Sequence, residues 1–195
     1  NLWASQETPL LNETYFYPPD WLQAQTEIVR YQLELPPGMP PGEYQVVLSL
    51  IDDMTAGRLP VRVGADGFQG VAYEAGRFDL TLPDAIVSAS RMQIVVAEDA
   101  TWLDGRLQLL GREEIAAEAL AGSKVPVHLF WHAPRGGLEA GLELHWLLRP
   151  GDGSADIEVD TTALSRFDTG LWRSGESMQE IYQIPLPPDL PPGSY

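Results

Sequence analysis

The histidines are the residues whose type and spacing first suggest metal chemistry. His128 and His132 lie four positions apart, a spacing that on a helix would direct two imidazoles at one zinc ion. The surrounding sequence VPVHLFWHA instead predicts a strand, in which the two residues lie about 13 Å apart. The chain has one further histidine, His145, and no cysteine, whereas a closed zinc site needs four ligands. We therefore expect ordinary strand histidines.

Nucleophilic catalysis is equally poorly supported by the residue pattern. The sequence has no GxSxG motif and no other recognisable set of nucleophile, base and orienting group. Without cysteine, thiol catalysis is excluded. We expect no catalytic residue, no enzymatic activity and no cofactor.

Oxygen-bearing side chains alternate in the stretch PGDGSADIEVD. Asp152, Ser154 and Asp156 carry the kind of oxygen ligands that bind calcium in a loop. The stretch lacks the spacing of an EF-hand, and a polar hairpin turn explains the same three residues. A calcium loop and a plain turn both remain open interpretations.

Aromatic residues suggest a surface on which sugar rings could stack. Trp3 and Trp102 stand beside polar turns, and Tyr15, Phe16 and Tyr17 are consecutive, so these five are the candidate platform for a cell-surface glycan. Only an exposed aromatic patch would mark such a surface, because most aromatics of a β protein lie in its core. The remaining tryptophans fall in or beside alternating apolar stretches, which predicts burial: Trp21, Trp131, Trp146 and Trp172.

Short strands must position all of these residues. Apolar and polar residues alternate along 28–35 and again along 44–50, which is typical of half-buried strands. The stretch DDMTAGR predicts a turn between strands, and VPVHLFWHA and LELHWLLR have the strongest strand character. Residues 112–121 could form a short helix by propensity, with an irregular segment as the alternative. The rhythm of short strands and turns predicts an all-β fold, a β-sandwich of immunoglobulin-like or jelly-roll-like type.

A long repeat organises the chain. Residues 21–44 and 172–195 have the same spacing from Trp to final Tyr, and ten of 24 positions are identical. The identities are residue types that define a fold, which we interpret as a duplicated module. The fold-defining pairs are Trp21 and Trp172, Tyr31 and Tyr182, Gly42 and Gly193, and Tyr44 and Tyr195.

The repeat also predicts the domain organisation. We expect 1–85 to be the C-terminal part of a first β module and 86–195 to be a second module without its last strands. Both copies are then incomplete, within a longer repetitive protein. We hypothesise that residues 45–63 pack where the missing strands of the second copy would lie, giving one permuted sandwich. Two separate modules are the alternative.

Charge and hydropathy restrict the partners. The formal net charge is −16, with only 12 Lys and Arg, which argues against nucleic acid or an anionic membrane surface as a partner. No run of about 18 apolar residues occurs, so we expect no direct membrane insertion by this chain.

Several motifs resemble a β-sandwich module found in bacterial membrane proteins of the dolichyl-phosphate-mannose-mannosyltransferase-like group. The resemblance covers about 95–195 and 1–63 and rests on LQLLG, VPVHLFWHA, LELHWLLRPGDG, the pattern Trp172-x-x-Gly175-Glu176, IPLPPDLPPGSY and LSLIDDMTAGRLPV. Trp21 departs from the pattern because no Gly-Glu pair follows it, and no catalytic portion of such a transferase is present.

This resemblance implies a non-catalytic structural or interaction domain on the extracytoplasmic face of a bacterial membrane. Its partner is then the remainder of a larger, membrane-anchored, glycosyltransferase-related polypeptide. A carbohydrate-binding accessory module is the alternative.

Overall fold

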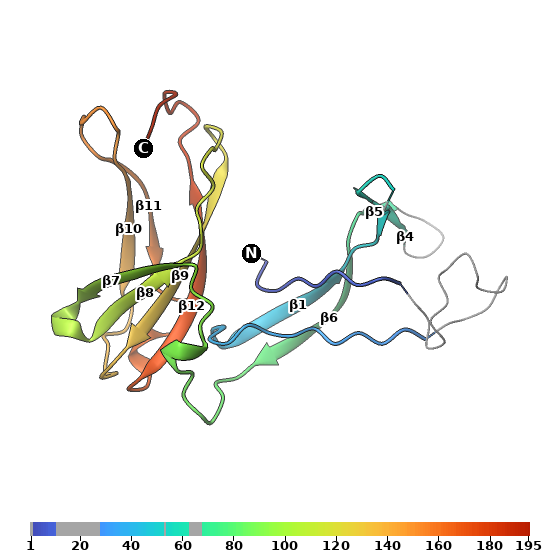
Figure 1. Ribbon diagram of the computed structural model, residues 1–195, viewed down its shortest axis with the longest axis horizontal. Coiled ribbons are helices and arrows are strands. Elements are labelled where there is room, and N and C mark those ends of the chain that lie inside the picture. Colours follow the sequence, from blue (N-terminus) through green and yellow to red (C-terminus); the bar gives the residue numbers. More distant parts are fainter. Residues whose placement is uncertain (1, 11–27, 53, 63–67) are drawn as a thin grey trace.

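The computed structural model describes residues 2–10, 28–52, 54–62 and 68–195. These residues form an all-β fold with several antiparallel sheets, as the sequence predicts. Strands β7 to β12 build a two-layer sandwich, and strands β1 to β6 build an arm that extends away from it (Figure 1). Of the described residues, none belongs to a helix with the length and hydropathy needed to cross a bilayer.

The sandwich consists of a four-stranded sheet in the order β12-β9-β8-β7 and a two-stranded sheet of β10 and β11. Its strands are β7 (Val96–Trp102), β8 (Leu107–Arg112), β9 (Lys124–Ala133), β10 (Glu143–Leu148), β11 (Ile157–Ala163) and β12 (Glu176–Pro185). Short 3-10 turns lie at η2 (Ala89–Arg91), η3 (Leu103–Gly105) and η4 (Thr169–Leu171).

The central strand β9 contains a proline. Because proline has no backbone N–H to donate to a neighbouring strand, it is tolerated where one side of the strand is unpaired. Pro126 pairs with Gln183 of β12 on one side, whereas the ladder to β8 runs only from Leu129 to His132. Pro126 therefore lies beyond the part of β9 that has strands on both sides.

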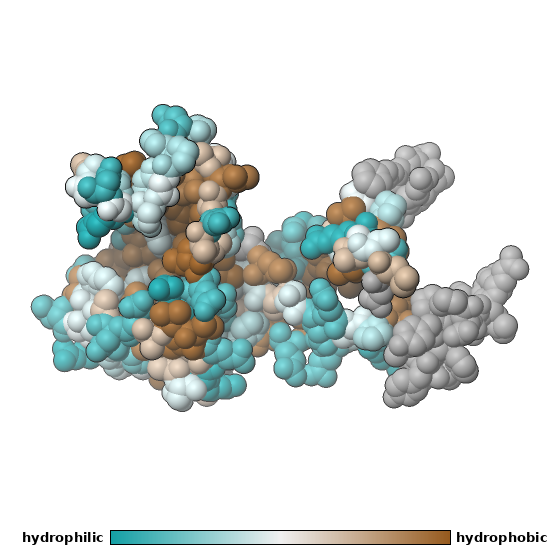
Figure 2. Space-filling view, turned by 45° about the horizontal axis from the view of Figure 1, so that its top comes forward, coloured by the Kyte–Doolittle hydropathy of each residue, from teal (hydrophilic) through white to brown (hydrophobic). Residues whose placement is uncertain are grey.

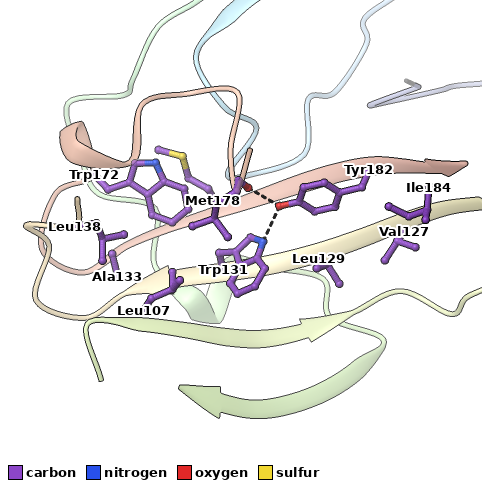
Figure 3. Close-up of a cluster of buried hydrophobic side chains, with 11 residues drawn as sticks. Leu107, Val127, Leu129, Trp131, Ala133, Leu138, Trp172, Met178, Tyr182 and Ile184 are labelled. Atoms are coloured by element: carbon purple, nitrogen blue, oxygen red, sulfur yellow. Dashed lines mark hydrogen bonds between the residues drawn. The ribbon is translucent and has the colours of Figure 1, made fainter. Parts of the chain in front are cut away.

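One face of β9 and one face of β12 make the core of the sandwich. Trp131 is 2% exposed, and its indole Nε1 donates a 3.1 Å hydrogen bond to the hydroxyl of Tyr182. That hydroxyl donates in turn to the carbonyl of Leu164. Figure 3 shows Trp131 and Tyr182 directed at each other inside the apolar cluster. The second sheet closes the cluster, because the Trp146 ring of β10 lies 5.1 Å from that of Tyr182.

The arm is a long hairpin with smaller strand pairs toward its far end (Figure 1). Strand β1 (Gly42–Leu48) pairs with β6 (Tyr73–Leu80), and the register shifts between Val46 and Val47. The smaller pairs are β2 (Ile51–Asp52) with β3 (Gly57–Arg58), and β4 (Val61–Arg62) with β5 (Phe68–Gly70).

Arm and sandwich meet through backbone groups at the free edge of β12. The N–H of Gln179 donates to the carbonyl of Gly38 at 2.9 Å, and its side-chain amide donates to the carbonyl of Pro37 at 3.0 Å. Within the described ranges no ladder joins β1 to the sandwich, because β1 pairs with β6 alone. The hypothesis that residues 45–63 complete the second copy therefore has no support from strand pairing.

The motif Trp172-x-x-Gly175-Glu176 fixes the segment that connects the two parts. Trp172 is 2% exposed, and Gly175 has a φ of +81°, which glycine adopts at low cost. The Arg173 guanidinium binds the buried Glu176 carboxylate through two nitrogens, at 2.5 and 3.1 Å. It also donates to the carbonyls of the linker residues 83 and 84, at 3.0 and 3.2 Å. Each residue of this motif thus has a structural role.

The two copies of the repeat form the same corner. The Tyr44 hydroxyl donates to the carbonyl of Pro40 at 2.6 Å, and the Tyr195 hydroxyl donates to that of Pro191 at 2.8 Å. A tyrosine bonded to the backbone a few residues upstream is a recurrent corner of β-sandwiches. Gly42 takes a φ of +148° beside the first corner, a value that favours glycine.

Several strand predictions are confirmed, one is wrong, and the structure decides the open alternative at residues 112–121. The predicted strands VPVHLFWHA and LELHWLLR are β9 and β10, and DDMTAGR connects β2 to β3. Residues 28–35, predicted as a strand, belong to no strand, because no segment of the described chain forms a ladder with them. Residues 112–121 form no helix; they are mostly exposed, and a short isolated helix gains too little from propensity alone.

Candidate functional site

Trp3 lies where the N-terminal segment, the arm and the sandwich meet. Its ring is edge-on to that of Tyr44, with centroids 5.9 Å apart and planes at 85°. The guanidinium of Arg166 lies over the same ring at 4.6 Å, a cation–π geometry. Tyr44 stacks on Phe78 of β6 at 5.6 Å and is only 7% exposed. Trp3 is thus fixed by packing in a defined orientation.

A shallow pocket of about 220 Å³ opens beside Trp3. Leu2 and Trp3 line it from the N-terminal segment, and the chain after β8 contributes Glu113 and Glu114. His128 of β9 completes the polar part of the wall. An aromatic ring beside carboxylates can stack on one face of a pyranose and accept hydrogen bonds from its hydroxyls.

His128 is held on both of its ring nitrogens. Its Nε2 lies 2.6 Å from Oε1 of Gln179, and its Nδ1 lies 2.9 Å from Oε1 of Glu113. The ring also stacks on Phe130, with centroids 4.8 Å apart. His128 therefore connects the pocket wall to the sheet, and it holds Glu113 in place.

Buried polar groups also lie near the contact between the arm and the sandwich. Glu180 is 4% exposed and accepts hydrogen bonds from the Ser165 hydroxyl at 2.5 Å and the Arg166 N–H at 3.0 Å. Burial raises the pKa of the Glu180 carboxyl, although these donors and the Arg166 charge act in the opposite direction. Burial likewise raises the pKa of the Tyr44 hydroxyl. Arg166 connects these groups to the arm, because its guanidinium lies over the rings of Trp3 and Tyr44.

Trp102 is the other described member of the predicted sugar platform. It is 47% exposed, at the end of β7, and its ring lies 5.9 Å from that of Trp131. Trp131 and His128 project from opposite faces of β9, because successive strand residues alternate. Trp102 and the Trp3 pocket therefore lie against opposite faces of the sheet and form no common surface. The other predicted members, Tyr15, Phe16 and Tyr17, lie outside the described residues, as does Trp21.

The predicted calcium ligands have other partners in the structure. Asp152 Oδ1 accepts the N–H of Ser154 at 2.9 Å, which makes a local turn. The Asp156 carboxylate binds Arg149 through both oxygens, at 3.0 and 2.9 Å. Across the described residues no three His, Cys, Asp or Glu side chains gather in a way that could hold a metal ion. The calcium loop thus gains no support, and the turn interpretation accounts for the hydrogen bonds.

The other two histidines lie away from the pocket. His132 Nδ1 lies 2.9 Å from the Ser177 hydroxyl, and His145 Nδ1 lies 3.0 Å from Glu158 Oε1 on the two-stranded sheet.

The sequence singles out Trp3 as a candidate but does not indicate the residues that surround it. Glu113 and His128 are 15 positions apart and meet only because β8 and β9 are neighbours in the sheet. For the arm contact a signal was available, because Glu180 lies at a core-facing position of a strand that otherwise buries Met178 and Tyr182. A charged residue at such a position needs a partner, here the Ser165 hydroxyl and the Arg166 backbone.

Comparison of the chain with protein-family models, with curated proteins and with solved structures finds no match.

Proposed function

We propose that this chain is a non-catalytic structural and interaction module, and that it belongs to a larger, membrane-anchored, glycosyltransferase-related protein on the extracytoplasmic face of a bacterial membrane. The structural role rests on one observation, namely that the buried polar side chains are bonded to other parts of the chain. The buried Glu176 carboxylate binds Arg173, which donates to the linker carbonyls of residues 83 and 84. The buried Glu180 carboxylate accepts from Ser165 and from the backbone of Arg166, whose guanidinium lies over the Tyr44 ring of the arm. The membrane context is supported by the motif resemblance alone.

Reading the coding sequence on both sides of the segment tests that context. We expect several apolar spans of about 20 residues in the same open reading frame, as in a multi-spanning protein. A secretion signal followed by a hydrolase domain, with no such spans, would overturn the membrane-anchored context.

Glycan binding is a second candidate function, favoured by the pocket beside Trp3. Tyr44 and Arg166 hold the Trp3 ring, and Glu113 and Glu114 supply acceptor oxygens in the pocket lining. We expect weak binding of a neutral saccharide whose sugar ring stacks on the indole of Trp3.

Titration of the chain against a saccharide panel by calorimetry tests this second function. Trp3→Ala should abolish binding, Trp3→Phe should retain part of it, and Trp102→Ala should bind like the unmodified chain, because Trp102 lies against the other face of the sheet. No binding by the unmodified chain, or equal losses in Trp3→Ala and Trp102→Ala, would rule out the pocket as a glycan site.

A further inference from the structure

Residues 28–35 carry the side chains of a buried strand but lie exposed. Tyr31, Leu33 and Leu35 alternate with polar residues, yet they are 50%, 41% and 40% exposed. Apolar side chains gathered at a surface mark an interaction site when they are contiguous. Figure 2 shows apolar side chains at the surface of the arm as well as over the sandwich.

The second copy of the repeat shows how the same positions are used when a partner is present. Tyr182 and Ile184, the counterparts of Tyr31 and Leu33, are 6% and 4% exposed. They lie in β12, which pairs antiparallel with β9 over its whole length. Trp131 of β9 also donates its indole N–H to Tyr182. The identical tyrosine is thus a core residue in one copy and an exposed residue in the other.

We propose that residues 28–35 are a docking strand whose partner is a β9-type strand of another module of this kind, with the sequence pattern of Lys124–Ala133. The register follows from the second copy, in which Tyr182 lies opposite Val127 and Pro185 lies opposite Lys124. Tyr31 then faces the valine of the partner strand, and its hydroxyl accepts from the partner's tryptophan. An added strand gains main-chain hydrogen bonds in the manner of β-augmentation.

Charge favours the same register. Glu34 occupies the position of Pro185 in the repeat and therefore falls opposite the lysine that corresponds to Lys124. Opposite charges facing each other across an antiparallel pair stabilise it. The counterpart position in the second copy is a proline, so this ion pair would be specific to the first copy.

The β9 strand of the same chain is not the partner of residues 28–35. Strand β12 pairs with it over its whole length, and β8 pairs with it from Leu129 to His132. In the register of the second copy, residues 28–35 would take the place of β12 and expose the Tyr182 side of the core. The partner is therefore a β9-type strand of a separate module rather than the chain's own.

The repeat spacing provides the experiment. Because residue 152 is the counterpart of residue 1, a second copy of residues 86–151 fused directly ahead of Asn1 places a β9-type strand at the spacing that β9 has from β12. Hydrogen exchange of the fusion and of the 195-residue chain is then compared. We expect the amides of 28–35 to exchange at least about 100-fold more slowly in the fusion, as for strands of a folded core.

A variant separates strand docking from other effects of the added segment. Leu33→Asp should remove the new protection in the fusion while leaving exchange in β9 and β12 of the original sandwich unchanged. Two outcomes overturn the proposal: a fused segment that folds while 28–35 still exchange as in the unfused chain, or a fused segment that stays unprotected beside a folded chain. Saccharide binding bears on neither outcome, so the docking strand and the glycan pocket can fail independently.

Discussion

The indole N–H of Trp131 donates a 3.1 Å hydrogen bond to the hydroxyl of Tyr182 inside the apolar core, and this hydroxyl donates its own hydrogen bond to the carbonyl of Leu164. One phenol oxygen thus satisfies two buried groups that have little access to water. The bond connects the two adjacent strands β9 and β12, and the Tyr182 ring also contacts Trp146 of the second sheet. The first copy of the repeat carries the same tyrosine, Tyr31, without this environment.

This contrast predicts different effects of the same substitution. Tyr182→Phe should lower the free energy of unfolding by about 1–2 kcal/mol, because the Trp131 N–H and the Leu164 carbonyl lose their partner. Tyr31→Phe should change it by less than about 0.5 kcal/mol, since Tyr31 is half exposed. Urea unfolding followed by tryptophan fluorescence measures both. Equal losses of unfolding free energy in the two variants would show that the Tyr31 hydroxyl is bonded within the fold as that of Tyr182 is.

Glu180 predicts a specific dependence of stability on pH. Its pKa is raised by burial, so between the unfolded and folded values the folded state binds more protons, and this group's contribution falls as the pH rises. Glu180→Gln keeps the shape and the acceptor oxygen without the charge. We therefore expect the variant to gain stability relative to the unmodified chain as the pH increases from about 4 to 7.

Glu158 supplies the matched control for that measurement. Its pKa is lowered, chiefly by its hydrogen bond to His145, so its contribution is present above the unfolded pKa and is lost as the pH falls. The series is therefore extended below pH 4, where Glu158→Gln should lose stability relative to the unmodified chain as the pH rises toward about 4.5, and should change little from about pH 5 to 7. A Glu180→Gln curve parallel to that of the unmodified chain would contradict the prediction.

At Gly111 the sandwich leaves no space for a larger side chain. A methyl group at this position of β8 would collide with the Ile94 side chain and with the carbonyl of Val96, both close to the β-bulge between β8 and β9. Gly111→Ala should therefore cost about 1–3 kcal/mol, a typical result of overpacking. Gly76→Ala, in β6 with open space around the added methyl, should be neutral or slightly stabilising. Thermal unfolding of the two variants tests the difference.

Arg173 predicts how the linker is held. Arg173→Ala leaves the buried Glu176 carboxylate without its guanidinium and frees the carbonyls of Pro83 and Asp84. The urea midpoint should fall, and proteolysis in the linker should become faster. Arg77→Ala removes two ion pairs that lie in solvent, to Glu43 and Glu74, and should leave both observables nearly unchanged. Similar cleavage rates for the two variants would mean that the Arg173 contacts do not hold the linker.

Local patterns in the sequence were enough to predict part of the candidate site. Trp3 stands beside polar residues, which predicts exposure; in the structure its side chain is partly buried and lines the pocket. The other wall of the pocket was not predictable, because Glu113 and His128 become neighbours only through the pairing of β8 with β9. Long-range pairing has no local signature, since the same alternating pattern fits many registers.

Alternation of apolar residues, turn residues and the repeat determined the all-β class, the strands β9 and β10, and the corner that Tyr44 and Tyr195 both form. These features depend on backbone preferences and on contacts a few residues apart, which the sequence encodes directly. Tertiary structure alone decided that Tyr182 is buried while Tyr31 is exposed. A strand exists only when another strand satisfies its N–H and C=O groups, and β9 provides that partner to residues 176–185 but not to residues 28–35.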